Sequence, residues 1–136
     1  MKRRWLTVLG CLIVAGWTAV VLAFGSFQSP DPLFLVGTVP FLLAGVLFAL
    51  AGTTESLGGI EWYQLSGLGD VLIGLSMSAQ FLWTATRSGS VPGDALVVDA
   101  IMAVGGLSLV FIGIDWIRGG KHFDLSTYES GPIFDG

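Results

Sequence analysis

The chain has 136 residues, of which 53% are hydrophobic and only 12% are charged. An average soluble domain carries about 25% charged residues, so this composition argues against a soluble enzyme and against a disordered linker. The formal net charge of −4 argues against a nucleic-acid-binding protein, which needs a basic face. We therefore expect a membrane protein whose main partner is the lipid bilayer and which binds no nucleic acid.

Four apolar stretches are each long enough to cross a bilayer, which takes about 20 residues of helix. They cover residues 5–24, 33–52, 62–86 and 95–117, and Gly- and Pro-containing segments separate them. Because the backbone must satisfy its own hydrogen bonds in lipid, these stretches should be helices. The sequence predicts an all-α integral membrane protein with four antiparallel transmembrane helices in a compact up-down bundle. Residues 1–118 would form this transmembrane domain, and residues 119–136 a short polar cytoplasmic tail.

The basic residues near the ends of the stretches predict the orientation in the cell membrane, since Lys and Arg concentrate on the cytoplasmic side. Five of the six lie at one predicted end of the bundle, and Arg87 alone lies at the other. Both termini should therefore be cytoplasmic. The five are Lys2, Arg3, Arg4, Arg118 and Lys121.

Two alternatives concern the first stretch and the two halves of the chain. Lys2-Arg3-Arg4 followed by an apolar run also fits a cleaved signal peptide, which would leave three spans. The run of about 18 residues is longer than a usual signal core, and this favours a retained helix. A Trp-x4-Gly pattern begins both the first and the third stretch, which is compatible with a parallel repeat or with chance.

Small residues recur at helical spacing in each stretch, as in helices that pack closely within a membrane. A repeat of about 100° per residue places them on one face of each helix. The expected packing faces are Ala15, Ala19 and Ala23 beside Gly16 in the first stretch; Gly45, Ala49 and Gly52 in the second, where Pro40 should kink the helix; Gly67, Asp70, Gly74 and Ser78 in the third; and Asp99, Ala103, Gly106 and Gly113 in the fourth.

Two aspartates, Asp70 and Asp99, fall on these packing faces and should point inward. An acid within a membrane span is a candidate functional site, and its alternative is a protonated or hydrogen-bonded packing residue. The two lie about 16 Å apart in depth, which is too far for a shared proton or cation. Gln80 lies at about the depth of Asp99 and is its expected hydrogen-bond partner. A proton path from Asp70 would need relay groups such as Ser76, Ser78 or Gln80.

The sequence offers no catalytic constellation, metal-ligand spacing or cofactor motif, so we expect neither an enzyme nor a bound cofactor. Cys11 is expected to pack as a small apolar residue, and His122 to be solvated in the tail. With two lysines and no asparagine, the composition resembles that of haloarchaeal proteins. The first functional hypothesis is a non-enzymatic accessory or structural membrane subunit, in a homo-oligomer or a larger membrane complex. The alternative is a small proton- or ion-coupled carrier that uses Asp70 and works as an oligomer.

Overall fold

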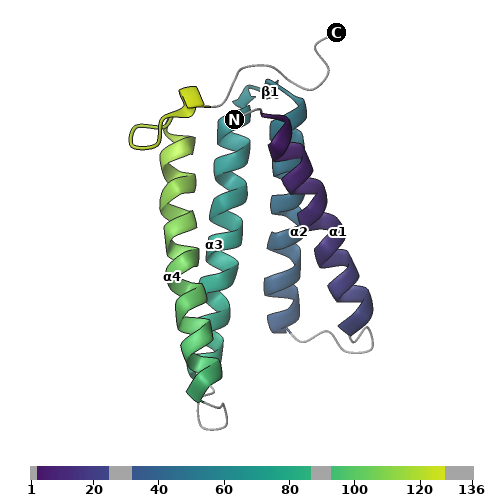
Figure 1. Ribbon diagram of the computed structural model, residues 1–136, viewed down its shortest axis with the longest axis vertical. Coiled ribbons are helices and arrows are strands. Elements are labelled where there is room, and N and C mark those ends of the chain that lie inside the picture. Colours follow the sequence, from purple (N-terminus) through teal and green to yellow (C-terminus); the bar gives the residue numbers. More distant parts are fainter. Residues whose placement is uncertain (1–2, 25–31, 87–92, 128–136) are drawn as a thin grey trace.

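Figure 1 shows the computed structural model, in which the long helices run side by side and alternate in direction. The structure describes residues 3–24, 32–86 and 93–127. The bounds of the helices lie within two residues of the expected stretches. The helices are α1 (Arg4–Phe24), α2 (Pro32–Thr53), α3 (Trp62–Thr86) and α4 (Gly93–Ile117), and a short 3-10 helix, η1 (Leu125–Thr127), follows α4.

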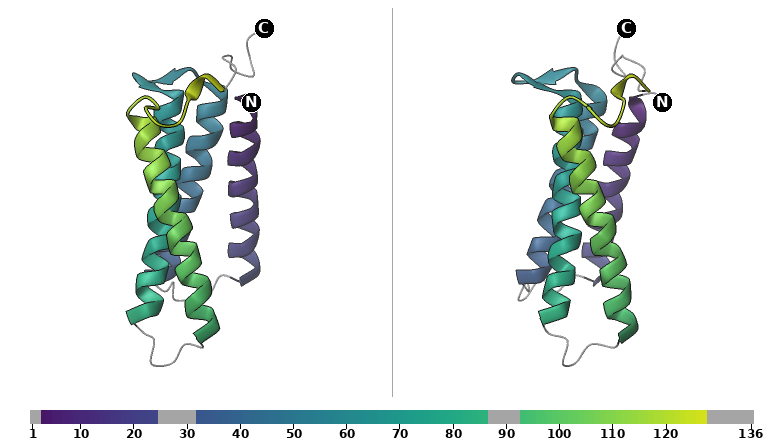
Figure 2. Two further views of the ribbon diagram at one scale, coloured as in Figure 1. Left: turned by 60° about the vertical axis from the view of Figure 1, so that its left-hand side comes forward. Right: turned by 90° about the vertical axis from the view of Figure 1, so that its left-hand side faces the viewer.

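A β-hairpin joins α2 to α3 and was not expected from the sequence. Its strands are β1 (Ser56–Leu57) and β2 (Ile60–Glu61), which pair antiparallel. The turn consists of Gly58 and Gly59, whose φ angles are +60° and +88°. Two positive φ angles in succession define the hairpin turn that glycine adopts most readily. The hairpin projects from the end of the bundle at which α1 begins and α4 ends (Figure 2).

The helices pack in chain order: α1 on α2, α2 on α3 and α3 on α4. Within the described ranges, α1 and α4 do not pack on each other along their length, so the bundle is open on that side and is less compact than expected. The main hydrophobic core lies where α1, α2 and α3 meet. It consists of Leu6, Ala44, Phe48, Ala51 and Leu65.

Glycines bring α3 and α4 into backbone contact at two levels. A Cβ atom at Gly67 would lie 2.5 Å from the carbonyl oxygen of Gly113, and one at Gly106 would lie 2.6 Å from that of Gly74. A Cβ atom at Gly113 would likewise meet the carbonyl oxygen of Gly67, and one at Gly74 would meet that of Gly106. These contacts confirm the packing faces expected for the third and fourth stretches. They also fix the register of the two helices.

The packing face expected for α1 is wrong. Ala15, Gly16, Ala19 and Ala23 are exposed, and a Cβ at Gly16 would have no neighbour within 4 Å among the described atoms. The helix instead packs through Gly10, where an added Cβ would meet backbone atoms of Gly45 and Ala49. Glycine permits a closer approach of two backbones than alanine does, and this favours the face that carries Gly10. On α2, the expected face with Gly45 is confirmed.

A proline explains one polar contact between α2 and α3. Pro40 lies inside α2 and has no N–H, so the carbonyl of Val36, four residues earlier, lacks its usual helical donor. The buried hydroxyl of Ser76 in α3 lies 3.3 Å from the Val36 oxygen and 3.4 Å from that of Gly37, and donates to this pair of carbonyls. Ser76, considered as a proton relay in the sequence analysis, therefore completes the backbone hydrogen bonding of a broken helical turn.

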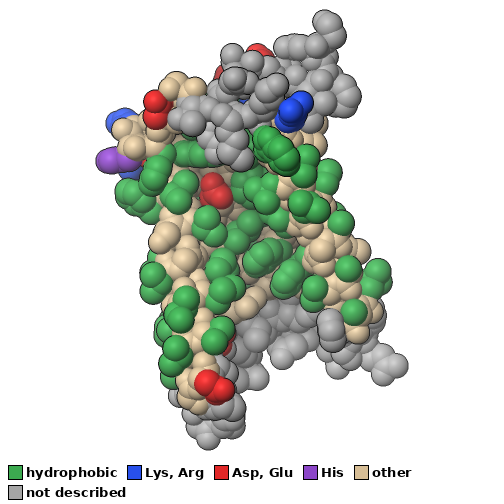
Figure 3. All heavy atoms as spheres, in the orientation of Figure 1, with side chains coloured by type: hydrophobic (Ala, Val, Ile, Leu, Met, Phe, Trp, Pro, Cys, Tyr) green, Lys and Arg blue, Asp and Glu red, His purple; other side chains and the backbone are tan. Residues whose placement is uncertain are grey.

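The outer surface of the helices is strongly apolar. All four helices of the described chain are long and apolar enough to cross a membrane. Large side chains point outward along each of them, and Leu22 and Ile101 are 69% and 66% exposed. Figure 3 shows hydrophobic side chains along the length of the bundle and basic ones gathered near one end. We call this end, which carries Arg3, Arg4, Arg118 and Lys121, the basic end.

We expect Gly106→Ala to destabilise the protein by about 1–3 kcal/mol, because the new methyl group meets the backbone of α3. Gly105→Ala is the matched control. A Cβ at this neighbouring position has its nearest contact, the Met77 Cε, at 4.0 Å. Thermal unfolding of both variants in the same detergent makes the comparison. Equal unfolding temperatures for the two would contradict the close approach at this seam.

Candidate functional site

A cavity of about 550 Å³ lies near the basic end, between α1 and α4. Because these two helices do not pack along their length, the cavity lies at the open side of the bundle. Figure 3 views the face on which α4 and α1 stand apart, and an acidic side chain is visible between them. Apolar side chains from three helices form the walls: Leu6 and Leu9 of α1, Phe48 of α2, and Leu109, Ile112 and Trp116 of α4.

Two polar side chains of α3, Ser66 and Asp70, also line this cavity, which we call the Asp70 cavity. They are one helical turn apart, so they share a face. Ser66 is 0% exposed, and its hydroxyl has no hydrogen-bond partner among the described residues. Asp70 is half-buried and likewise forms no hydrogen bond or ion pair within the described part of the chain. Asp70 therefore points into the bundle, as the sequence analysis expected, and lines a cavity rather than a filled interface.

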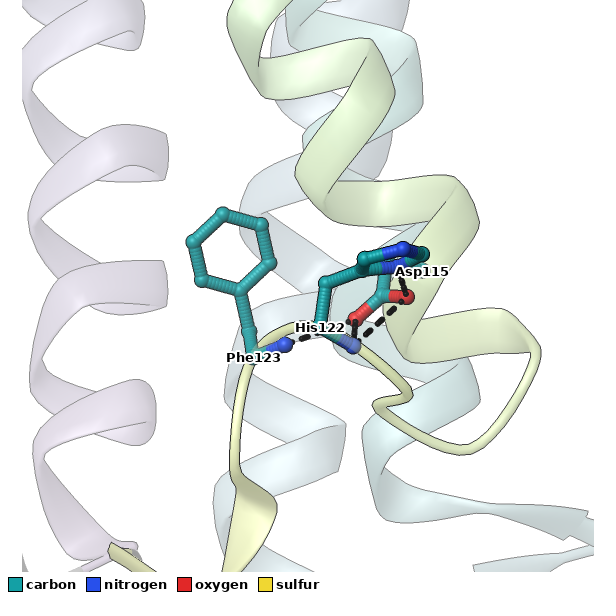
Figure 4. A network of polar contacts seen from close by, with 3 residues as sticks. All are labelled: Asp115, His122 and Phe123. Atoms are coloured by element: carbon teal, nitrogen blue, oxygen red, sulfur yellow. Dashed lines mark hydrogen bonds and ion pairs between the residues drawn. The ribbon is translucent and has the colours of Figure 1, made fainter.

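The segment after α4 folds back over the cavity, where His122, Phe123 and Asp124 form part of its lining. Asp115, buried in the last turn of α4, holds this segment (Figure 4). Its Oδ2 accepts hydrogen bonds of 3.0 Å from the backbone N–H groups of both His122 and Phe123. The His122 Nδ1 lies 2.8 Å from Asp115 Oδ1. One carboxylate thus orders two successive peptide groups and an imidazole.

The turn into this segment depends on two glycines. Gly119 and Gly120 have φ angles of +94° and +68°, and their N–H groups bond to the carbonyls of Trp116 and Asp115. This is the usual way in which a helix ends with its last carbonyls satisfied. The sequence analysis treated residues 119–136 as a polar tail with a solvated histidine. In the described part of that tail, the His122 side chain is 69% exposed, as expected, and its ring also lies beside Phe111 and pairs with Asp115.

Asp124 adds a second carboxylate to the cavity lining. Hydrogen bonds from the Ser126 hydroxyl and N–H, the latter 2.8 Å long, hold the pKa of Asp124 below its ordinary value. Asp124 is therefore ionised at neutral pH. Together with Asp70 it gives the cavity an acidic lining, and the ring of the single histidine there is already paired with Asp115.

Arg3 is part of the packed structure at the basic end, although the sequence analysis used it only as a marker of orientation. Its side chain is 2% exposed, and its Nη2 donates a 2.6 Å hydrogen bond to the carbonyl of Thr54, just after α2. The guanidinium lies 5.3 Å from the centre of the Trp62 ring. A cation at a helix C-terminus and over an aromatic face is stabilised by both contacts.

The other two candidate residues, Asp99 and Gln80, lie away from the Asp70 cavity. The glycine pairs place Asp99 level with Phe81, so Gln80 has the expected depth. However, the Gln80 amide nitrogen would lie 2.8 Å from a Cβ at Gly37, so this side chain faces α2, not α4. No hydrogen bond joins Gln80 to Asp99 in the described structure. The same register puts Asp70 level with Val110, eleven residues after Asp99, or about 16 Å along the bundle.

The lining of the Asp70 cavity is mostly apolar and contains few polar groups. Its polar groups are the Asp70 carboxylate and Ser66 hydroxyl of α3, together with the His122 ring and the Asp124 carboxylate of the covering segment. Within the described ranges, no three His, Cys, Asp or Glu side chains come together to hold a metal ion. Sequence reasoning missed Ser66 and the covering segment. The Gly119-Gly120 pair after the last span was the available signal for the turn.

We expect Asp115→Ala to release the segment that covers the cavity, because two backbone N–H groups and the His122 ring lose their common acceptor. Amide hydrogen exchange across residues 118–127 should rise by about tenfold or more. Lys121→Gln, an exposed change in the same segment, is the control and should leave exchange unchanged. Unaltered protection in Asp115→Ala would show that this carboxylate does not hold the segment.

The comparisons with known proteins add a family assignment. No curated protein and no solved structure matches the chain. A family model does match, and it covers residues 1–129, which include all four long helices and the segment over the Asp70 cavity. The chain therefore belongs to DUF7994, a family of unknown function.

Proposed function

We propose that this chain is a four-span membrane protein that acts as a non-enzymatic accessory or structural subunit, with both termini in the cytoplasm. The apolar outer surface supports the membrane placement. In water, exposed side chains such as Leu12 and Leu107 would form a large hydrophobic patch prone to aggregation, whereas lipid accommodates them. The basic residues at the basic end, Arg3, Arg4, Arg118 and Lys121, support the orientation, and Lys2 directly precedes Arg3 in the sequence.

The observation that carries the subunit role is the exposed small-residue face of α1. This face contains Ala15, Gly16, Ala19 and Ala23, and none of the four is covered in the structure. Small residues let a second helix approach closely in lipid, where packing rather than hydrophobicity drives association. The face is therefore suited to a helix of another chain, either a second copy or a different membrane protein.

We expect the wild-type chain to resist carbonate extraction from membranes and to emerge from mild detergent in an assembly of more than one chain. Ala19→Leu should shift the assembly towards the single chain, since the larger side chain separates the helices. Native mass spectrometry gives the composition. Val104→Leu, at an exposed position of α4, is the control and should not alter it.

The partner can be identified through Cys11, which is exposed one helical turn before Ala15 on the same face. If the partner is a second copy, a membrane-permeant oxidant should form a disulfide-linked dimer, and Ala19→Leu should suppress it. An assembly without this disulfide indicates a different protein in the complex. A wild-type chain that is strictly monomeric in native membranes would refute the subunit role.

A second candidate function, a small proton- or ion-coupled carrier, is favoured by the cavity that reaches Asp70. The contact of Gly74 with Gly106 closes α3 against α4 beyond this cavity, so a complete pathway would need a further chain. In the carrier role, liposomes that contain the wild-type protein should show proton flux to a pH-sensitive dye. Asp70→Asn should reduce this flux to that of empty liposomes, and equal flux in both would remove Asp70 from the mechanism.

A further inference from the structure

The Asp70 cavity contains polar groups that the described chain leaves without partners. The Asp70 carboxylate and the fully buried Ser66 hydroxyl line the same space, and neither forms a hydrogen bond there. Buried polar groups in folded proteins are generally paired, so an unpaired hydroxyl beside an unpaired carboxylate calls for an explanation. A bound ligand that offers positive charge and a hydrogen bond would satisfy both groups.

The walls define the other part of such a ligand. Apart from Ser66 and Asp70, the side chains that the four helices contribute are apolar, and aromatic rings come from Phe48 and Trp116. Phe123 of the covering segment adds a third ring. The volume of about 550 Å³ lies within the range of small-molecule sites. Aromatic faces near a carboxylate are the surroundings in which proteins bind organic cations.

We propose that the Asp70 cavity binds a hydrophobic organic cation, a positively charged nitrogen or phosphorus centre attached to an apolar body. Asp70 supplies the opposite charge, and Ser66 supplies a hydrogen-bond acceptor where the cation carries N–H groups. The apolar body lies against Phe48, Leu109 and Ile112. The segment from His122 to Asp124 covers the cavity and places a second carboxylate at its edge.

The opening between α1 and α4 suits a ligand of this kind. A hydrophobic cation concentrates in a membrane, and the cavity lies at the side of the bundle where α1 and α4 do not pack on each other. Such a molecule could therefore reach Asp70 from the lipid. Binding of such a cation to the Asp70 cavity requires neither the subunit role nor transport, and a binding measurement tests it directly.

Tetraphenylphosphonium and tetraphenylborate are matched probes, since they have nearly the same shape and opposite charge. We expect the purified full-length protein to bind labelled tetraphenylphosphonium saturably in equilibrium dialysis and to bind tetraphenylborate at least about tenfold more weakly. Asp70→Asn, which keeps the size of the side chain, should weaken phosphonium binding by about tenfold or more. Asp99→Asn is the matched control, a second intramembrane acid that does not line this cavity, and it should bind as the wild type does.

Two further variants keep the test decisive if Asp70→Asn folds poorly. Leu109→Trp should fill the cavity and abolish binding, while Asp70 itself is unchanged. Ser66→Ala should raise the melting temperature of the free protein, because a buried unpaired hydroxyl is removed. Equal binding of the two probes by the wild type, or full phosphonium binding by either Asp70→Asn or Leu109→Trp, would overturn the proposal.

The cation could be an amine-bearing membrane lipid or a free amphiphilic amine, and the lipid composition distinguishes them. In nanodiscs of phosphatidylglycerol alone, phosphonium should bind with full affinity. Adding phosphatidylethanolamine should weaken this binding if a lipid amine occupies the cavity. Unchanged binding, together with competition by dodecylamine, would identify a free amine as the ligand class.

Discussion

The backbone contact between α3 and α4 fixes the arrangement on which the candidate site depends. Gly67 lies against Gly113 and Gly74 against Gly106, with too little space between them for a methyl group. Because two such pairs lie two turns apart, they determine both the level and the rotation of each helix. This rotation turns the face with Ser66 and Asp70 away from the outer surface. Asp70 therefore lines a cavity because of glycine packing and not because of a polar partner.

The cavity exists because the four helices pack as a series and do not close into a ring. Each helix packs on the next, and α1 and α4 remain apart at the side. The space between them is covered near the basic end by residues that follow α4, which Asp115 holds in place. A single carboxylate in the last helical turn thus anchors the residues that cover the cavity. The same few residues end the helix, fold the chain back and contribute to the lining.

Hydropathy was sufficient to predict the helices, since their bounds follow from the length of the apolar runs. Spacing also predicted the α3–α4 interface and the inward position of Asp70, because glycine there leaves few alternatives. It failed on α1, where an alanine stripe and Gly10 lie on different faces and only the partner helix selects between them. Spacing also placed Gln80 at the right depth but on the wrong interface. The depth of a side chain follows from its residue number, whereas the helix that it faces depends on how the helices are arranged. The contact of His122 with Asp115 depends on a glycine turn that hydropathy cannot register.

The hairpin between α2 and α3 bears on the proposed placement of the protein in a bilayer. Leu57 and Ile60 face each other across its two strands, and about half of each side chain is exposed. In the proposed orientation this pair lies at the cytoplasmic boundary of the bilayer. There the two apolar side chains would insert into the lipid, and the neighbouring Glu61 would stay in water. The hairpin would then hold the adjoining ends of α2 and α3 at a fixed depth in the bilayer and limit the tilt of these helices.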